Sequence, residues 1–147
     1  MISANFPPAI GGPASLVPCV SRKLAHRGHE VTILTRSGRN LPRQSKSEQV
    51  TIIRVPFISA REYFKLHIAI FNLMSLCFYG YLTLYRSRID VTIAHDTNLS
   101  AITGVFFKKL KKNALAIRYA GDLSYEYLSL RRGITSIERI FAKTDRE

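Results

Sequence analysis

Short apolar runs rich in β-branched residues alternate with longer segments of helical periodicity along this chain. Strands that alternate with helices predict a parallel sheet with right-handed crossover connections. The sequence therefore predicts an α/β fold of the doubly wound parallel type, in one domain of 147 residues. The predicted strands are residues 31–35, 50–55, 91–95 and 114–118, and the predicted later helices are residues 61–88, 99–110, 124–132 and 135–143.

The beginning of the chain combines a short apolar start, residues 1–5, with a Pro/Gly-rich loop over residues 6–13. We expect residues 1–5 to supply a short first strand. Ser15 then suits the N-cap of a first helix, Pro18 is tolerated in a first turn, and Gly28 suits the position just after the helix. A basic stretch, residues 36–47, carries four basic side chains and no acidic one, and this pattern predicts an exposed loop.

The net charge of the chain is +12, from 22 Lys and Arg residues against 10 Asp and Glu residues. This surplus favours anionic partners, namely a membrane surface, a phosphorylated ligand or nucleic acid, and charge alone does not choose among them. We expect no secretory signal, because the first basic residue is Arg22 and no charged region precedes an apolar run. Cys19 and Cys77 lack the spacing of metal ligands, so we expect buried, reduced thiols. The expected location is cytoplasmic, with peripheral contact to the inner face of the membrane as an option.

Ligands of parallel α/β sheets bind at the carboxyl ends of the strands, where the loop with Gly11 and Gly12 is expected. Two glycines permit a close backbone approach, and the following helix directs its first amides at the loop. A phosphate or diphosphate would fit there, although a simple strand-to-helix turn explains the residues equally well. The loop lacks the GxGxxG fingerprint, and Thr35-Arg36 stands where a ribose-binding acid would follow the second strand. These absences disfavour a nicotinamide dehydrogenase.

His95 and Asp96 end a predicted strand at the same edge of the sheet. A histidine there could hydrogen-bond a sugar hydroxyl or a phosphate, or it could carry a proton. The neighbouring backbone could equally satisfy this side chain, so both interpretations stay open.

The turn around Gly121 is a further place at this edge. Arg118 precedes the turn, and Asp122 and Glu126 lie one helical turn apart, on one face. They could accept hydrogen bonds from a polyol. Helix capping and solvation explain both acids somewhat better than ligand contact does.

The long apolar segment of residues 66–85 has three interpretations, because 15 of its 20 residues are apolar. A domain helix with a wide buried face is favoured, added contact with a membrane surface comes second, and a transmembrane span comes third. A narrow polar stripe at helical spacing consists of Asn72, Ser75, Tyr79 and Thr83. The flanking cations, which suit anionic headgroups and water equally, are Arg61, Lys65, Arg86 and Arg88.

A cluster of lysines, Lys108, Lys109, Lys111 and Lys112, ends another predicted helix. Cations there complement the helix dipole, so a solvated face is the default interpretation. A nucleic-acid site would add interleaved aromatic residues and a basic groove. Only part of that pattern is visible, and we expect no nucleic-acid partner.

Four stretches of the chain form a set in a fixed order. They read F-P-P-A-I-G-G over residues 6–12, R-G-H-E-V over residues 27–31, I-D-V-T-I-A-H over residues 89–95 and R-Y-A-G-D over residues 118–122. As a set they resemble the N-terminal domain of family 4 glycosyltransferases, which have the GT-B fold. The last stretch is similar to the R-x-G-G-D-x-x-W-E text of some members. Tyr125 takes the place of the tryptophan, and Ala120 replaces one glycine.

The resemblance implies two Rossmann-like domains with a cleft between them, of which this chain would be the N-terminal, acceptor-side half. The C-terminal half of the family holds the nucleotide sugar with two glutamates separated by seven residues, and this sequence has no such pair. We therefore expect an incomplete glycosyltransferase unit, inactive alone, with a C-terminal donor-binding domain as its partner. The resemblance also implies retaining transfer from a nucleotide sugar to a glycan or lipid-linked acceptor, such as an envelope polysaccharide precursor, with no metal or other cofactor.

The resemblance implies roles for only a few residues of this chain. Gly11 and Gly12 would face the donor diphosphate, and His95 would act as the catalytic residue in contact with the transferred sugar or phosphate. The remaining cleft and acceptor candidates are Asp96, Arg118, Gly121, Asp122 and Glu126. Two rival functions stay open: a non-catalytic accessory subunit, and a membrane-surface protein anchored by the long apolar segment.

Overall fold

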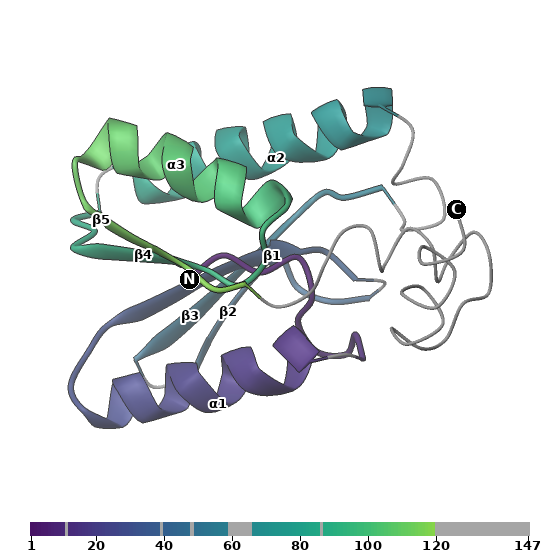
Figure 1. Ribbon diagram of the computed structural model, residues 1–147. Helices are drawn as coiled ribbons and strands as arrows, with labels where there is room; N and C mark the ends of the chain where they lie inside the picture. The colour runs from purple at the N-terminus through teal and green to yellow at the C-terminus, as the bar shows by residue number, and fades with distance from the viewer. Residues whose placement is uncertain (11, 39, 48, 59–65, 86, 120–147) are drawn as a thin grey trace, which may run out of the picture.

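The computed structural model shows a β-sheet between two helical layers (Figure 1). The structure describes residues 1–10, 12–38, 40–47, 49–58, 66–85 and 87–119. The helices predicted over residues 124–132 and 135–143 lie outside them. The helices are α1 (Gly12–His26), α2 (Leu66–Leu84) and α3 (Leu99–Lys111), and the strands are β1 (Val31–Arg36), β2 (Gln44–Ser47), β3 (Val50–Val55), β4 (Val91–Ala94) and β5 (Ala114–Ile117).

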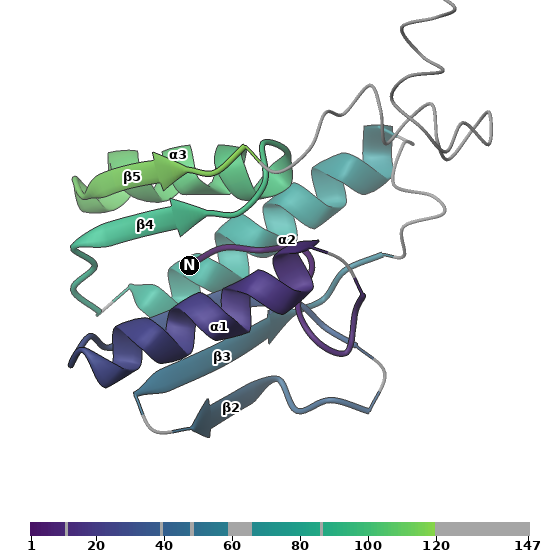
Figure 2. The ribbon, with the colours of Figure 1, turned by 60° about the horizontal axis from the view of Figure 1, so that its bottom comes forward.

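Residues 1–3 join the two halves of the sheet. β1 pairs in parallel with β3, and β4 pairs in parallel with β5. Ile2 forms parallel bridges to both Leu34 of β1 and Ala94 of β4, so it lies between the two halves. The spatial order is β2, β3, β1, residues 1–3, β4 and β5. Of the short first strand expected over residues 1–5, the structure shows only the bridges of Ile2, which place this segment at the centre of the sheet. Figure 2 shows β3, β4 and β5 pointing toward the same edge.

Helices cover both faces of the sheet, with α1 on one side and α2 and α3 on the other (Figure 1). Ile33 of β1 packs in one cluster with Val17 of α1, whereas the next residue, Leu34, packs with Leu76 of α2 and Phe107 of α3. Successive side chains of a strand point to opposite faces, so an apolar run without polar alternation is what a strand covered on both sides requires.

The N-terminal boundary predicted for α1 is wrong. The helix begins at Gly12, so Ser15 lies within its first turn and Pro18 lies inside it. The predicted C-terminus is confirmed, because Gly28 has φ of +86° and its amide bonds the carbonyl of Ala25. The amide of His29 reaches back to the carbonyl of Leu24, which completes the hydrogen-bond pattern typical of a glycine-terminated helix.

The two cysteines also differ from the expectation. Both thiols are free, as predicted, but Cys19 is exposed on α1 and Cys77 of α2 is half-buried. Burial raises the pKa of the Cys77 thiol. The apolar positions of α1 point to the sheet, and Cys19 falls on the opposite side of the helix, which explains its exposure.

The basic stretch predicted as a loop contains an edge strand instead. β2 pairs antiparallel with β3, from Gln44 opposite Ile53 to Ser47 opposite Val50. The guanidinium of Arg54, which is largely buried, donates hydrogen bonds to the Ser45 hydroxyl at 2.9 Å and to the Pro42 carbonyl at 3.2 Å. A polar run has no strand periodicity of its own, and here the free edge of β3 and the Arg54 contacts supply the order.

The long helix is shorter than predicted, since it ends at Leu84. Residues 61–65 and 86, with Arg61, Lys65 and Arg86, lie outside the described part of the chain, as does the Thr83 side chain. None of the described helices combines the length and the apolar character that crossing a membrane requires. Asn72 and Ser75 of the polar stripe are buried against the domain.

We predict that Gly80→Ala destabilises the domain, although alanine has a higher helix propensity than glycine. An added Cβ would lie 2.7 Å from Cζ of Phe107 and 2.9 Å from Cδ2 of Leu34, and both neighbours are buried. Overpacking costs about 1–3 kcal/mol, whereas alanine gains at most about 1 kcal/mol over glycine in a helix. Urea unfolding should show a net loss of about 1–2 kcal/mol.

The matched background is Phe107→Leu, which opens space beside residue 80. Gly80→Ala should cost less in that background than in the wild type, as coupled neighbours do. A Gly80→Ala protein more stable than the wild type would contradict the close contact of α2 with α3 and β1.

Candidate functional site

The carboxyl edge of the sheet has its centre beside residues 1–3, where the strand order reverses. The chain passes from this central segment to β1 and β3 on one side and later to β4 and β5 on the other. Crevices at such a reversal are where open α/β sheets bind ligands. The purple start of α1 lies at this edge in Figure 2. The structure thus brings the loop before α1 and the end of β4 to one place, as predicted.

Three buried polar residues lie side by side on neighbouring segments at this edge. Ile2 bridges Leu34 and Ala94, so one step further along each strand Ser3 lies between Thr35 and His95. The amide of Ser3 bonds the carbonyl of Leu34 at 3.0 Å, and the amide of His95 bonds the carbonyl of Ile2 at 2.9 Å. We call Thr35, Ser3 and His95 the polar row.

The polar row faces the layer of α1. Thr35 alternates with Leu34, which packs toward α2 and α3, and therefore shares the face of Ile33, which packs with α1. His95 follows Ala94, whose Cβ lies toward Gly104 of α3, so the His95 side chain falls on the opposite side. The row consequently lies on the face where α1 begins.

Thr35 and His95 leave polar atoms without partners. Both residues are almost fully buried, with exposed fractions of 1% and 2%. Oγ1 of Thr35 and both ring nitrogens of His95 have no hydrogen-bond partner among the described residues, whereas the Ser3 hydroxyl donates to the Asn5 carbonyl at 2.8 Å. An unmade hydrogen bond at a buried group costs about 1–3 kcal/mol. These atoms are therefore able to bond a polar ligand that enters the edge.

Burial lowers the pKa of His95 to about 4, and the positive charges of the Met1 amino group and Arg118 act in the same direction, while Asp96 opposes them. The imidazole is neutral at physiological pH, so one ring nitrogen donates and the other accepts a hydrogen bond. A neutral imidazole suits a hydroxyl group better than it suits an ionic contact with phosphate. The sequence left two interpretations of His95 open: contact with a ligand, or hydrogen bonds to the neighbouring backbone. The second is not supported, because neither ring nitrogen has a hydrogen-bond partner among the described residues.

Asp96 stabilises the start of α3. Its Oδ1 accepts hydrogen bonds from the amides of Asn98 at 3.1 Å and Ser100 at 3.2 Å, and its Oδ2 accepts one from the Ser100 hydroxyl. A carboxylate at a helix N-terminus is favoured by the helix dipole. Both oxygens are thus used inside the fold, and a ligand-binding role for Asp96 stays a prediction.

Gly12 is the first residue of α1, and no acidic residue occupies the first turn of that helix. A Cβ added to Gly12 would meet nothing within 4 Å, so packing inside the domain does not demand glycine there. The helix start therefore directs the positive end of its dipole toward open space, with no acidic side chain in the first turn to balance it. Gly11, the other half of the predicted diphosphate loop, lies outside the described residues.

Arg118 extends the polar row by one strand. Ala94 pairs with Ile117, so Arg118 lies beside His95, and its amide bonds the carbonyl of Ala94 at 2.8 Å. Its side chain is exposed at the carboxyl edge and supplies a cation next to the neutral imidazole. The other predicted residues of this turn, Gly121, Asp122 and Glu126, lie outside the described part of the chain.

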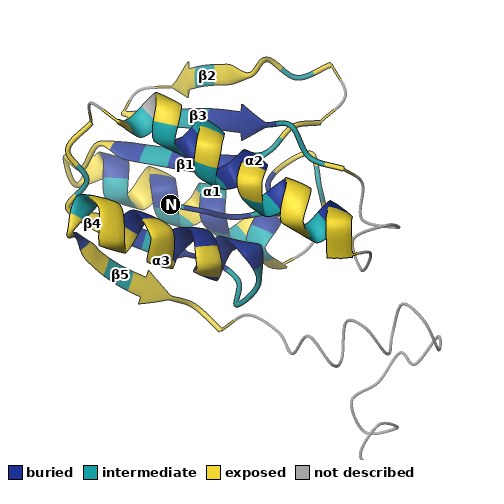
Figure 3. Ribbon diagram, turned by 90° about the horizontal axis from the view of Figure 1, so that it is seen from above, coloured by how far each residue is buried: buried dark blue, intermediate teal, exposed yellow. Residues whose placement is uncertain are grey.

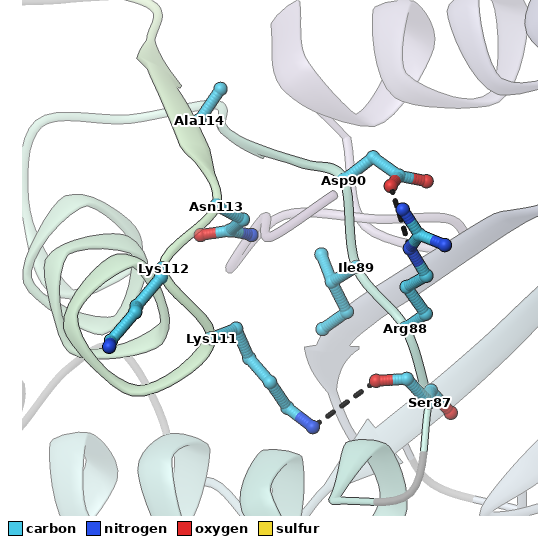
Figure 4. A pocket seen from close by; sticks show the side chains of 8 residues that line it. All are labelled: Ser87, Arg88, Ile89, Asp90, Lys111, Lys112, Asn113 and Ala114. Carbon is cyan, nitrogen blue, oxygen red and sulfur yellow. Dashed lines mark hydrogen bonds and ion pairs between the residues drawn. The ribbon is translucent and has the colours of Figure 1, made fainter.

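A hollow of about 450 Å³ lies at the opposite, amino edge of the sheet (Figure 4). Two of its cations already have partners: Arg88 pairs with Asp90 at 3.4 Å, and Nζ of Lys111 donates to the carbonyl of Ser87 at 3.1 Å. The hollow is shallow and charged, and it is far from the polar row. We therefore assign the candidate site to the carboxyl edge.

A family model described as "Glycosyl transferase 4-like domain" matches residues 11–143, which is nearly the whole chain. The chain belongs to this family. The resemblance stated from the sequence is thereby confirmed, and the parallel sheet covered on both faces agrees with a Rossmann-like half of the GT-B fold. Membership of a glycosyl transferase 4-like family supports a role in glycosyl transfer, with a sugar donor and an acceptor in general. Comparison with curated proteins gives no significant match.

Sequence reasoning did not identify the Thr35 hydroxyl or Ser3 as members of the site. Thr35-Arg36, as the end of a predicted strand, was expected at the ligand edge and lacks the acidic residue that a ribose would need, but no role followed for the Thr35 hydroxyl. Aligning the ends of the predicted parallel strands would have placed both residues beside His95, but that alignment requires the register, which depends on the pairing of residues 1–3 with β1 and β4.

We predict that His95 makes the fold sensitive to acid. Its folded pKa of about 4 lies below the ordinary value of 6.5, so the unfolded chain binds the proton more readily. Stability from this group is present above pH 6.5 and is lost as the pH falls toward 4. The free energy of unfolding should drop by about 2 kcal/mol between pH 8 and pH 5 on this account.

The measurement is urea unfolding at both pH values for the wild type, His95→Gln and the control His26→Gln. His95→Gln should show a smaller drop than the wild type, and His26→Gln, an exposed position, should follow the wild type. Equal drops in all three proteins would show that His95 does not carry the pH dependence.

Proposed function

We propose that this domain is the acceptor-side half of a retaining glycosyltransferase, which moves a sugar from a nucleotide-sugar donor to a glycan or lipid-linked acceptor. The observation that carries the proposal is the polar row with its unpartnered Thr35 and His95 atoms, beside the start of α1, in a domain of this family. Neutral donors and acceptors in a buried row suit the hydroxyl groups of a sugar.

The start of α1 would contact the donor diphosphate. The first-turn amides and the positive end of the helix dipole point to the edge where the polar row lies. Arg118 adds a cation on the far side of His95. These groups would stabilise the negative charge that develops on the departing diphosphate, and we propose that transfer uses this stabilisation without a bound metal.

The reaction exchanges one bond at the anomeric carbon for another. The bond from this carbon to the diphosphate oxygen breaks, the acceptor hydroxyl oxygen forms the new bond on the same face, and the hydroxyl proton passes to the leaving diphosphate. His95 is the catalytic candidate because a hydrogen bond to the transferred sugar would orient it during this exchange.

A donor-binding experiment tests the proposal. The imidazole signals of His95 are followed by NMR while UDP-glucose, GDP-mannose and the parent nucleotides are added to the full chain. We expect at least one nucleotide sugar to shift the His95 signals, and to shift them more than its parent nucleotide does. If no donor in a broad panel shifts them while a glycan acceptor binds, the accessory-subunit alternative is favoured.

Thr35→Val is the sharpest variant for this site. The substitution removes a buried hydroxyl that has no partner among the described residues, so the free energy of unfolding should stay equal or rise by about 1 kcal/mol. Donor binding should weaken by about fivefold, the equivalent of one hydrogen bond. Gly12→Ala should also weaken donor binding without loss of stability, because its Cβ enters open space.

The control is Thr32→Val, which makes the same substitution on the same strand three residues nearer the amino edge, with its side chain on the opposite face of the sheet. It should leave donor binding unchanged. Equal donor affinity for Thr35→Val and the wild type would remove Thr35 from the site.

We also propose that sugar transfer requires a partner domain that supplies the main nucleotide site. We predict that the 147-residue chain binds donor weakly and transfers no sugar, whereas addition of a donor-binding domain with a glutamate pair restores transfer. Mass spectrometry of an acceptor incubated with nucleotide sugars measures this. Transfer by the chain alone would contradict the requirement for a partner and leave the assignment of the site intact.

A further inference from the structure

α2 is apolar on its outer side as well as on its inner side, and its polar side chains Asn72 and Ser75 are buried. Its buried polar side chains face the protein: Asn72 bonds both the amide and the carbonyl of Ile58, at 2.9 Å and 3.4 Å, and the Ser75 hydroxyl donates to the carbonyl of Pro56. The side turned to solvent is apolar apart from the exposed His67. Its exposed large apolar residues are Leu66, Ile70, Phe71, Met74, Phe78 and Leu82, and Tyr85 follows directly after the helix.

This arrangement is not explained by the packing of the domain. Surface helices normally bury an apolar stripe and present charged residues to water. α2 contains no charged residue over its whole length, and Met74 and Phe78 expose 62% and 56% of their surface. A run of exposed apolar side chains of this size marks an interaction surface.

α3 extends the same surface. α2 and α3 lie side by side, with outward-facing exposed segments along both in Figure 3. The contact is close, since the Phe107 ring of α3 reaches the backbone of Gly80. The neighbouring Phe106 is exposed, as are Ile102 and Leu110. We call these three residues, the six exposed apolar residues of α2 and Tyr85 the α2–α3 face.

Cations gather at one end of the α2–α3 face. Lys111 reaches Tyr85, the residue directly after α2, and its Nζ lies 5.7 Å from the centre of the Tyr85 ring. The same helix end carries Lys108, Lys109 and Lys112, all exposed, and neither α2 nor α3 contains an acidic residue. The end of the face is therefore strongly positive, in a chain of net charge +12.

We propose that the α2–α3 face docks on the surface of an anionic lipid bilayer. The apolar side chains would enter the boundary between headgroups and acyl chains, while the lysines would contact the anionic headgroups. A second copy of the chain fits the same face less well, because it brings a second lysine cluster and no acidic residue to pair with either. The carboxyl edge with His95 is not part of the face, so this inference does not depend on the proposed transferase activity.

The test is flotation of the full chain with vesicles of phosphatidylcholine alone and with vesicles that contain about 30% phosphatidylglycerol. We expect binding to the anionic vesicles and little binding to the neutral ones. Met74→Glu with Phe78→Glu should lower binding by about tenfold or more, because two anchors then carry a charge of the wrong sign. The control Val91→Glu adds a charge at an exposed apolar residue outside the face and should change binding little.

A second pair of variants tests the charge. Lys108→Gln, Lys109→Gln and Lys112→Gln together should lower binding to anionic vesicles by about tenfold or more at low salt. Neutralising Arg22 and Lys23 on α1, together with Arg27 directly after it, removes the same charge from the opposite helical layer and should cost less. Circular dichroism confirms that each variant is folded.

Three results would overturn the proposal. One is no binding of the wild type to anionic vesicles, and another is equal loss from the variants on the face and their controls. The third is a concentration-dependent dimer, measured by sedimentation, that Met74→Glu with Phe78→Glu disrupts while vesicle binding is absent. That result would assign the face to a second copy instead.

Discussion

Four backbone hydrogen bonds made by the central segment, residues 1–3, hold the sheet together. They join Ile2 to Ile93 and His95, Ser3 to Leu34, and Leu34 to Met1, at 2.8–3.0 Å. Without them the two parallel pairs, β1 with β3 and β4 with β5, would share no ladder. The same bonds set the register in which Thr35, Ser3 and His95 end side by side. The candidate site therefore depends directly on the central segment.

The two helical layers have different roles. α1 begins at the carboxyl edge, on the face of the sheet that carries the polar row, so this layer belongs to the proposed site. α2 and α3 cover the other face, and their own outer surface is apolar with a lysine cluster at one end. A domain arranged in this way could rest on a lipid surface through α2 and α3 while its ligand edge stays open at the side of the sheet.

Much of the fold could be predicted from local patterns. The β-branched runs located β1, β3, β4 and β5 within a residue or two, and Gly28 marked the end of α1 because a left-handed residue there needs no Cβ. The failures have a common cause. β2 is polar and owes its order to the edge of β3, and the start of α1 depends on how the preceding loop leaves the sheet, so neither can be read from periodicity.

The long apolar segment shows most clearly what the sequence determines and what only the tertiary structure decides. Its sequence determined a long helix, predicted over residues 61–88 and observed as Leu66–Leu84, with a polar stripe that includes Asn72 and Ser75. Only the tertiary structure decided that this stripe faces inward, because the backbone groups of Ile58 and Pro56 needed hydrogen-bond partners there. The same holds for the site: the sequence by itself determined that His95 lies at the end of a strand and that Gly12 lies in the turn that leads into a helix, whereas the structure decided that the helix begins at Gly12. Strand pairing decided that His95 has Thr35 and Ser3 as neighbours, since a register is set by long-range hydrogen bonds and not by any local run of residues.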